Sequence, residues 1–90
     1  MPKKETQFLD IMTYYKSGID TLIKKAQSLN IESENIDYRS ADQLHRVIIE
    51  SSKTNIRKIV KFAKNLSVRS ISIRYYGKGK YTECKEERIL

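Results

Sequence analysis

The chain has 90 residues, of which 39% are hydrophobic and 32% are charged, with a formal net charge of +7. This length supports one small core, so we expect a single folded domain over residues 1–90 and exclude a two-domain protein. No apolar run is long enough to span a membrane, and Cys84 is the only cysteine, which excludes an intrachain disulfide. We therefore expect a cytoplasmic protein without a membrane segment.

Positive charge is concentrated in the second half of the chain. Residues 1–45 carry six basic and seven acidic residues, whereas residues 46–90 carry twelve and four. Residues 51–82 contain nine basic residues and no acidic one. Because protein surfaces usually mix both signs, this segregation indicates an anionic partner.

Apolar residues recur at helical spacing between residues 5 and 30. The stripe begins at Phe8, Met12 and Tyr15 and continues to Leu29 at intervals of three and four residues. We predict an amphipathic helix over residues 5–30, preceded by disordered residues 1–4. A helix this long offers more surface than a small domain can cover, so we expect its end to form a homodimer interface.

The middle of the chain permits a short strand followed by one or two helices. Apolar and polar residues alternate over 36–39, which allows a third, short strand there. Ser40 and Gln43 have the spacing of a helical capping box. From there, residues 40–66 form either one long helix or two shorter ones separated within "ESSKTN". We favour the break, with a serine or threonine of that stretch capping the later helix.

The C-terminal part alternates with the period of a β-strand. We predict a β-hairpin over residues 68–88, with its turn at "GKGK". A symmetric turn there would pair Ile73 with Cys84 on the buried face. The same register would pair Tyr76 with Tyr81 on the exposed face.

This order of elements resembles that of winged-helix proteins, a variant of the helix-turn-helix. The stretches that carry the resemblance are "IDYRSADQL", "KTNIRKIVKFAKNL" and "VRSISIRYYGKGKYTEC". The resemblance implies an α+β fold with two or three helices and a C-terminal β-hairpin as the wing. It also implies that the last helix enters the major groove of double-stranded DNA while the wing meets the backbone or minor groove.

A row of cations marks the candidate binding face. Lys53, Arg57, Lys61 and Lys64 are spaced so that a helix places them within about one quadrant. Like charges at this spacing slightly destabilise a helix, and a polyanion would relieve the repulsion. Cations and aromatic residues also crowd the hairpin tip, where they could contact phosphates and stack on bases. The candidate nucleic-acid-binding residues are Lys53, Arg57, Lys58, Lys61, Lys64, Arg74, Tyr76, Lys78, Lys80 and Tyr81.

Enzymatic motifs are scarce in this sequence. His45 and Cys84 are the only pair that could supply a base and a nucleophile, and both have simpler structural interpretations. We therefore expect no enzymatic activity, no cofactor and no metal. The predicted function is nucleic-acid binding, with DNA favoured over RNA. A protein-binding adaptor or inhibitor is the alternative, and a ribonuclease that uses lysine, arginine and tyrosine side chains is a third hypothesis.

Overall fold

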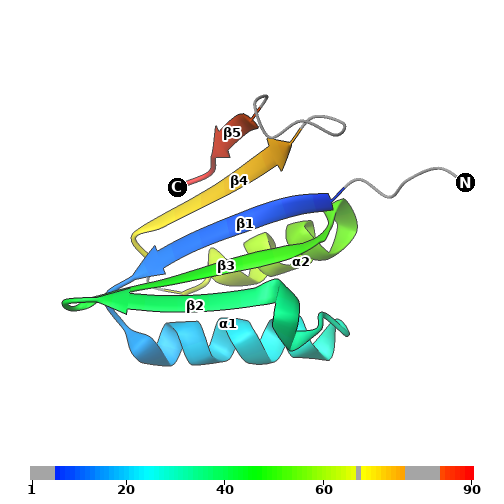
Figure 1. Ribbon diagram of the computed structural model, residues 1–90. Helices are drawn as coiled ribbons and strands as arrows, with labels where there is room; N and C mark the ends of the chain where they lie inside the picture. Colours follow the sequence, from blue (N-terminus) through cyan, green and yellow to red (C-terminus); the bar gives the residue numbers. More distant parts are fainter. Residues whose placement is uncertain (1–5, 67, 77–83) are drawn as a thin grey trace, which may run out of the picture.

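A computed structural model describes residues 6–66, 68–76 and 84–90 of the chain. Its elements, in chain order, are β1 (Thr6–Thr13), α1 (Lys16–Ser28), a 3-10 turn (Ser33–Asn35), β2 (Ile36–Ala41), β3 (Leu44–Ser52), α2 (Lys53–Ala63), β4 (Ser70–Tyr76) and β5 (Cys84–Arg88). The five strands form one antiparallel sheet in the order β2-β3-β1-β4-β5. Both helices pack on β1 and β3, on the same face of the sheet (Figure 1).

The predicted α+β class is confirmed, but the order of elements differs from that of a winged helix. Two segments that we expected to be helical form β1, the central strand of the sheet, and its neighbour β3. The first six large elements run β-α-β-β-α-β, which is the order of the ferredoxin-like motif, and β5 extends the sheet beyond β4.

The helix predicted over residues 5–30 is wrong for its first part, which forms β1. Leu9 and Ile11 are fully buried against the helices, whereas Phe8 and Met12 lie on the opposite face of the sheet. Residues four apart share a face in a strand as well as in a helix, so the spacing of Phe8 and Met12 fits both structures. The pairing of this segment with β3 and β4 identifies it as a strand.

The helix predicted from residue 40 is also wrong up to Ser52, because this segment forms β2, a turn and β3. Val47, Ile48 and Ile49 are consecutive β-branched residues, which pack well on a pleated surface. The expected capping box is instead a two-residue turn, in which Asp42 has a φ of 56°. Aspartate tolerates this left-handed conformation, so the turn joins two paired strands without glycine. The short strand expected at 36–39 is confirmed within β2.

Helix α1 ends in a Schellman motif and presents a polar outer surface. The amide of Ile31 donates to the carbonyl of Ala26 at 3.2 Å, and Asn30 between them has a φ of 63°. Ile19, Leu22 and Ala26 are fully buried against the core. The exposed residues of the helix are Lys16, Ser17, Asp20, Thr21, Lys24, Gln27 and Ser28. No apolar stripe remains on α1 for the dimer interface that we expected there.

Helix α2 begins directly after β3, as the proposed break in "ESSKTN" predicts. Ser52 is its N-cap, and the Ser52 hydroxyl accepts a hydrogen bond from the amide of Asn55 at 3.3 Å. Ile56, Ile59, Val60 and Ala63 turn toward the sheet. The cations of the helix are therefore left on its outer surface.

Strands β4 and β5 pair antiparallel, as predicted, but in another register. Ile73 lies opposite Glu87, and Tyr76 lies opposite Cys84. The predicted pairing of Ile73 with Cys84 is therefore wrong by three residues. Residues 77–83 connect the two strands and lie outside the described residues. Because Tyr76 pairs with Cys84, the expected pairing of Tyr76 with Tyr81 is also wrong. The predicted register assumed a symmetric turn about Lys78 and Gly79, whereas the observed pairing places Tyr76 opposite Cys84.

Candidate nucleic-acid interface

The candidate interface begins with the basic residues of α2. Lys53, Arg57, Lys61 and Lys64 are all exposed and recur along one side of the helix and at its C-cap. At 1.5 Å rise per residue, this row is about 17 Å long. No acidic residue occurs anywhere in α2. We call these four residues the basic row.

The basic row lines one wall of a groove between α2 and the β4–β5 side of the sheet. The opposite wall contains Gln7, Ile73, Glu87 and Ile89. The helices pack on β1 and β3 (Figure 1), and three residues of the opposite wall, Ile73, Glu87 and Ile89, come from the β4–β5 side of the sheet. Four cations therefore face a groove whose lining residues include one carboxylate, that of Glu87.

Lys58 lies apart from the basic row. It is exposed on α2, but it is absent from the groove lining because one residue along a helix turns the side chain by about 100°. The structure therefore separates the five predicted helical cations into four that share a groove and one that does not.

The structure describes only two of the other five predicted site residues. Arg74 and Tyr76 belong to β4, and Lys78, Lys80 and Tyr81 fall in 77–83, outside the described residues. The strand ends that flank this segment lie at the end of the sheet where α2 begins, as the pairing of β1 with both β3 and β4 shows (Figure 1). The start of the basic row and the strand ends that flank 77–83 thus lie at the same end of the sheet.

His45 and Cys84 do not form a base and nucleophile pair. His45 lies opposite Thr13, whereas Cys84 lies opposite Tyr76 at the other end of the sheet. The Nδ1 atom of His45 is 2.8 Å from the hydroxyl of Tyr38, and the two rings stack. Over the residues described, no group of three potential ligands is positioned to hold a metal ion.

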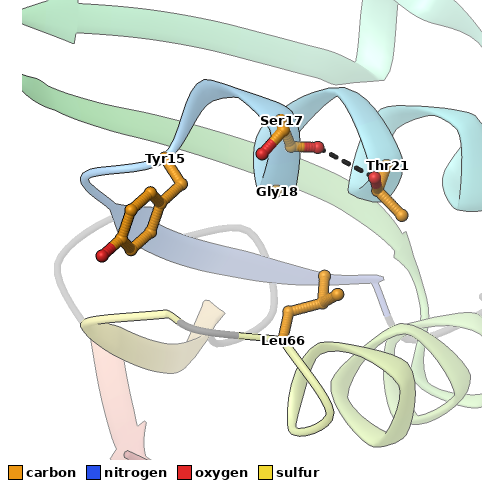
Figure 2. A pocket seen from close by; sticks show the side chains of 5 residues that line it. All are labelled: Tyr15, Ser17, Gly18, Thr21 and Leu66. Carbon is orange, nitrogen blue, oxygen red and sulfur yellow. Dashed lines mark hydrogen bonds between the residues drawn. The ribbon is translucent and has the colours of Figure 1, made fainter.

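A second hollow lies at the start of α1. It is lined by Tyr15, Ser17, Gly18, Thr21 and Leu66, as Figure 2 shows. The hydroxyl of Thr21 donates to the carbonyl of Ser17 at 2.8 Å, so this polar group is already engaged within the helix. None of the five lining residues is charged. The hollow therefore lacks the electrostatic character of the groove beside α2.

The far wall of the groove and the central ion pair of the sheet were not predicted from the sequence. Arg46 donates from Nε to Oδ1 of Asp10 at 2.9 Å and also contacts Oδ2, while Asp10 is only 2% exposed. These hydrogen bonds raise the pKa of the Arg46 guanidinium. The segment "TQFLDIMT" does not alternate apolar and polar residues, and the partner of Asp10 is 36 residues away, so no local signal in the sequence reveals this pair.

Comparison with protein-family models, with curated proteins and with solved structures finds no match to this chain. Neither helix in the described part of the chain has the length and apolar character needed to cross a membrane. Functional inference therefore depends on the geometry and charge of the site itself.

Proposed function

We propose that this protein binds nucleic acid through the basic row of α2. The observation that carries the proposal is that Lys53, Arg57, Lys61 and Lys64 share one groove without an acidic residue on their helix. Each phosphate that a lysine or arginine neutralises releases counterions, which favours binding without any base-specific contact. The resulting affinity is strongest at low salt.

Double-stranded DNA is the proposed ligand. A rigid helix holds its cations in a fixed line, and a duplex presents regularly spaced phosphates at about one charge per 1.7 Å of axis. A straight row about 17 Å long suits such a backbone better than it suits a flexible single strand. This argument does not require a winged helix.

The segment after β4 is proposed to extend the interface. The strand ends that flank 77–83 lie at the same end of the sheet as the start of α2, and this segment contains Lys78, Lys80 and Tyr81. Arg74 and Tyr76 precede it on β4. Cations there would add phosphate contacts, and the tyrosines could stack on sugars or bases.

A pair of charge reversals on the same helix tests the proposal. Arg57→Glu places a carboxylate in the basic row, whereas Lys58→Glu makes the same charge change outside the groove. We expect Arg57→Glu to weaken binding of a short duplex by at least about tenfold at low salt, and Lys58→Glu to weaken it several-fold less. Fluorescence anisotropy with labelled duplex DNA measures both.

Equal losses from the two variants would contradict a defined binding face. Absence of binding to duplex DNA and to single-stranded RNA at low salt would overturn the proposal and favour the protein-binding adaptor. Cleavage of the RNA during the same incubation, lost on Lys78→Ala or Lys80→Ala, would instead favour a ribonuclease.

A further inference from the structure

A carboxylate faces the groove beside α2 from the sheet. Leu9, Ile73 and Glu87 lie opposite one another across β1, β4 and β5. Residues paired in this way project from the same face of an antiparallel sheet. Leu9 is fully buried and Ile73 is 5% exposed, whereas Glu87 is exposed and lines the groove. The row that begins in the core therefore ends in a carboxylate opposite the cations of α2.

The residues around Glu87 on this wall are apolar. Ile89 is two residues further along the chain, and its amide donates to the carbonyl of the fully buried Ile71 at 2.8 Å. Ile73 and Val60 also line the groove. The basic row contributes four positive charges and Glu87 one negative charge, so the net charge of the lining is 4 − 1 = +3. The groove is therefore positive along α2 and negative only at β5.

The direction of the basic row indicates where its phosphates lie. Lys53, Arg57, Lys61 and Lys64 line the groove, and Lys58 does not. A helix that entered the major groove with its outer surface would bring Lys58 to the DNA as well. The four cations of the row instead converge on the space between α2 and the β4–β5 side of the sheet. Phosphates that neutralise them therefore lie in the groove.

The size of the groove suits one backbone of a duplex. Its volume is about 460 Å³, far less than that of a duplex segment as long as the basic row. Phosphates follow each strand at about 3.4 Å of helix axis, so a row about 17 Å long spans about five of them. A single backbone can enter the groove while the other backbone and the bases remain outside.

On the basis of the proposed function, we propose that one phosphate backbone of the duplex lies in the groove between the basic row and Glu87, and that Glu87 weakens its binding. The phosphates contact the cations along α2, and the sugars pack against the apolar residues of the far wall. Helix α2 does not enter the major groove. Contacts to the backbone carry no sequence information directly, so binding is independent of base sequence.

Glu87 opposes the backbone through its charge. A carboxylate and a phosphate repel each other, and the repulsion grows where the groove excludes water. Any contact that Glu87 makes with the basic row in the free protein also competes with phosphates for the same cations. Both effects have the same direction, so removal of this carboxylate strengthens binding.

Two neutral substitutions test this placement. Glu87→Gln removes a carboxylate from the groove, whereas Asp20→Asn removes one from the exposed side of α1. Both raise the net charge by one, so a general effect of net charge is the same in both. We expect Glu87→Gln to bind a short duplex at least about threefold more tightly than wild type at low salt, and Asp20→Asn to stay within about 1.5-fold of wild type. Fluorescence anisotropy measures both, and equal affinities of the two variants would overturn the placement.

Photo-crosslinking locates the DNA independently of its affinity. A short thiol-directed crosslinker is attached at Ile89→Cys in the groove or at Lys58→Cys outside it, each in a Cys84→Ser background. We expect duplexes of unrelated sequence to crosslink more efficiently from residue 89 than from residue 58. More efficient crosslinking from residue 58 would place the DNA on the outer side of α2 and overturn the proposal.

These outcomes can be distinguished from failure of the proposed function. If wild type binds no duplex at low salt, both proposals fall. If wild type binds and Arg57→Glu weakens binding, while Glu87→Gln and Asp20→Asn behave alike, the basic row stands and the groove placement falls. A preference of more than about a thousandfold for one duplex sequence would show base contacts and contradict a backbone lying in the groove.

Discussion

At the scale of single residues, the Asp10–Arg46 pair is the contact that sequence reasoning was least able to reveal. It joins two strands that are neighbours only in the folded sheet, and it buries a carboxylate on a face without a covering layer. Because its hydrogen bonds to Asp10 raise the pKa of Arg46, deprotonation of the arginine breaks the pair only as the pH rises through that raised pKa, far above neutrality. The arginine therefore stays charged across the neutral range.

Asp10→Ala should destabilise the protein more than the removal of any exposed carboxylate. The substitution leaves the Arg46 guanidinium partly buried without its partner, and we expect the free energy of unfolding to fall by about 2 to 3 kcal/mol. Chemical denaturation measures it. Asp37→Ala is the matched control, because it breaks an exposed ion pair with Arg39 and should cost less than about 1 kcal/mol. Equal costs would mean that burial does not strengthen the Asp10–Arg46 pair.

At the scale of elements, the sequence predicted those whose signals are local. The N-cap and apolar stripe of α2 are read within a few residues, and so is the alternation in β4. The strands β1 and β3 were mistaken for helices because residues four apart share a face in both structures. Their pairing with distant segments decides between the two, and this information is not local. The basic row was predicted because its four residues lie within one helix. The far wall of its groove was not predicted, because its residues come from distant segments of the chain.

Two alanine substitutions distinguish the observed strand β1 from the helix predicted over residues 5–30. Leu9 is fully buried in β1, so Leu9→Ala should lower the free energy of unfolding by about 2 to 5 kcal/mol. Tyr15 belongs to the predicted helical stripe but is 61% exposed, so Tyr15→Ala should cost less than about 1 kcal/mol. Urea denaturation of both variants is the measurement. A larger loss from Tyr15→Ala than from Leu9→Ala would contradict the strand.

The N-cap of α2 supports the helix that carries the basic row. Ser52→Ala removes the hydrogen bond to the amide of Asn55 and should lower the free energy of unfolding by about 1 kcal/mol. Ser52→Asp keeps an acceptor at the cap and should retain most of the stability. Thermal denaturation followed by circular dichroism compares them, and an equal loss in both would argue against capping by this side chain.

At the scale of the whole molecule, positive charge is divided unevenly over the surface. The groove beside α2 gathers four cations, whereas Arg39 and Arg46 on the strands of the sheet are each paired with a carboxylate. A surface of a single sign attracts a polyanion over long distances. The nucleic-acid proposal therefore depends on the basic row.

The salt dependence of DNA binding tests the central claim most directly. The logarithm of the binding constant is measured against the logarithm of salt concentration for wild type, for Arg57→Gln with Lys61→Gln, and for Lys16→Gln with Lys24→Gln. The first pair lies in the basic row, and the second removes the same charge from the exposed side of α1.

If the basic row contacts phosphates, the slope for Arg57→Gln with Lys61→Gln should be shallower than that of wild type by about 2, because each lost phosphate contact removes about 0.9. The slope for the α1 pair should equal that of wild type. Equal slopes for all three proteins, or an equal reduction in both double variants, would contradict a phosphate-binding face on α2.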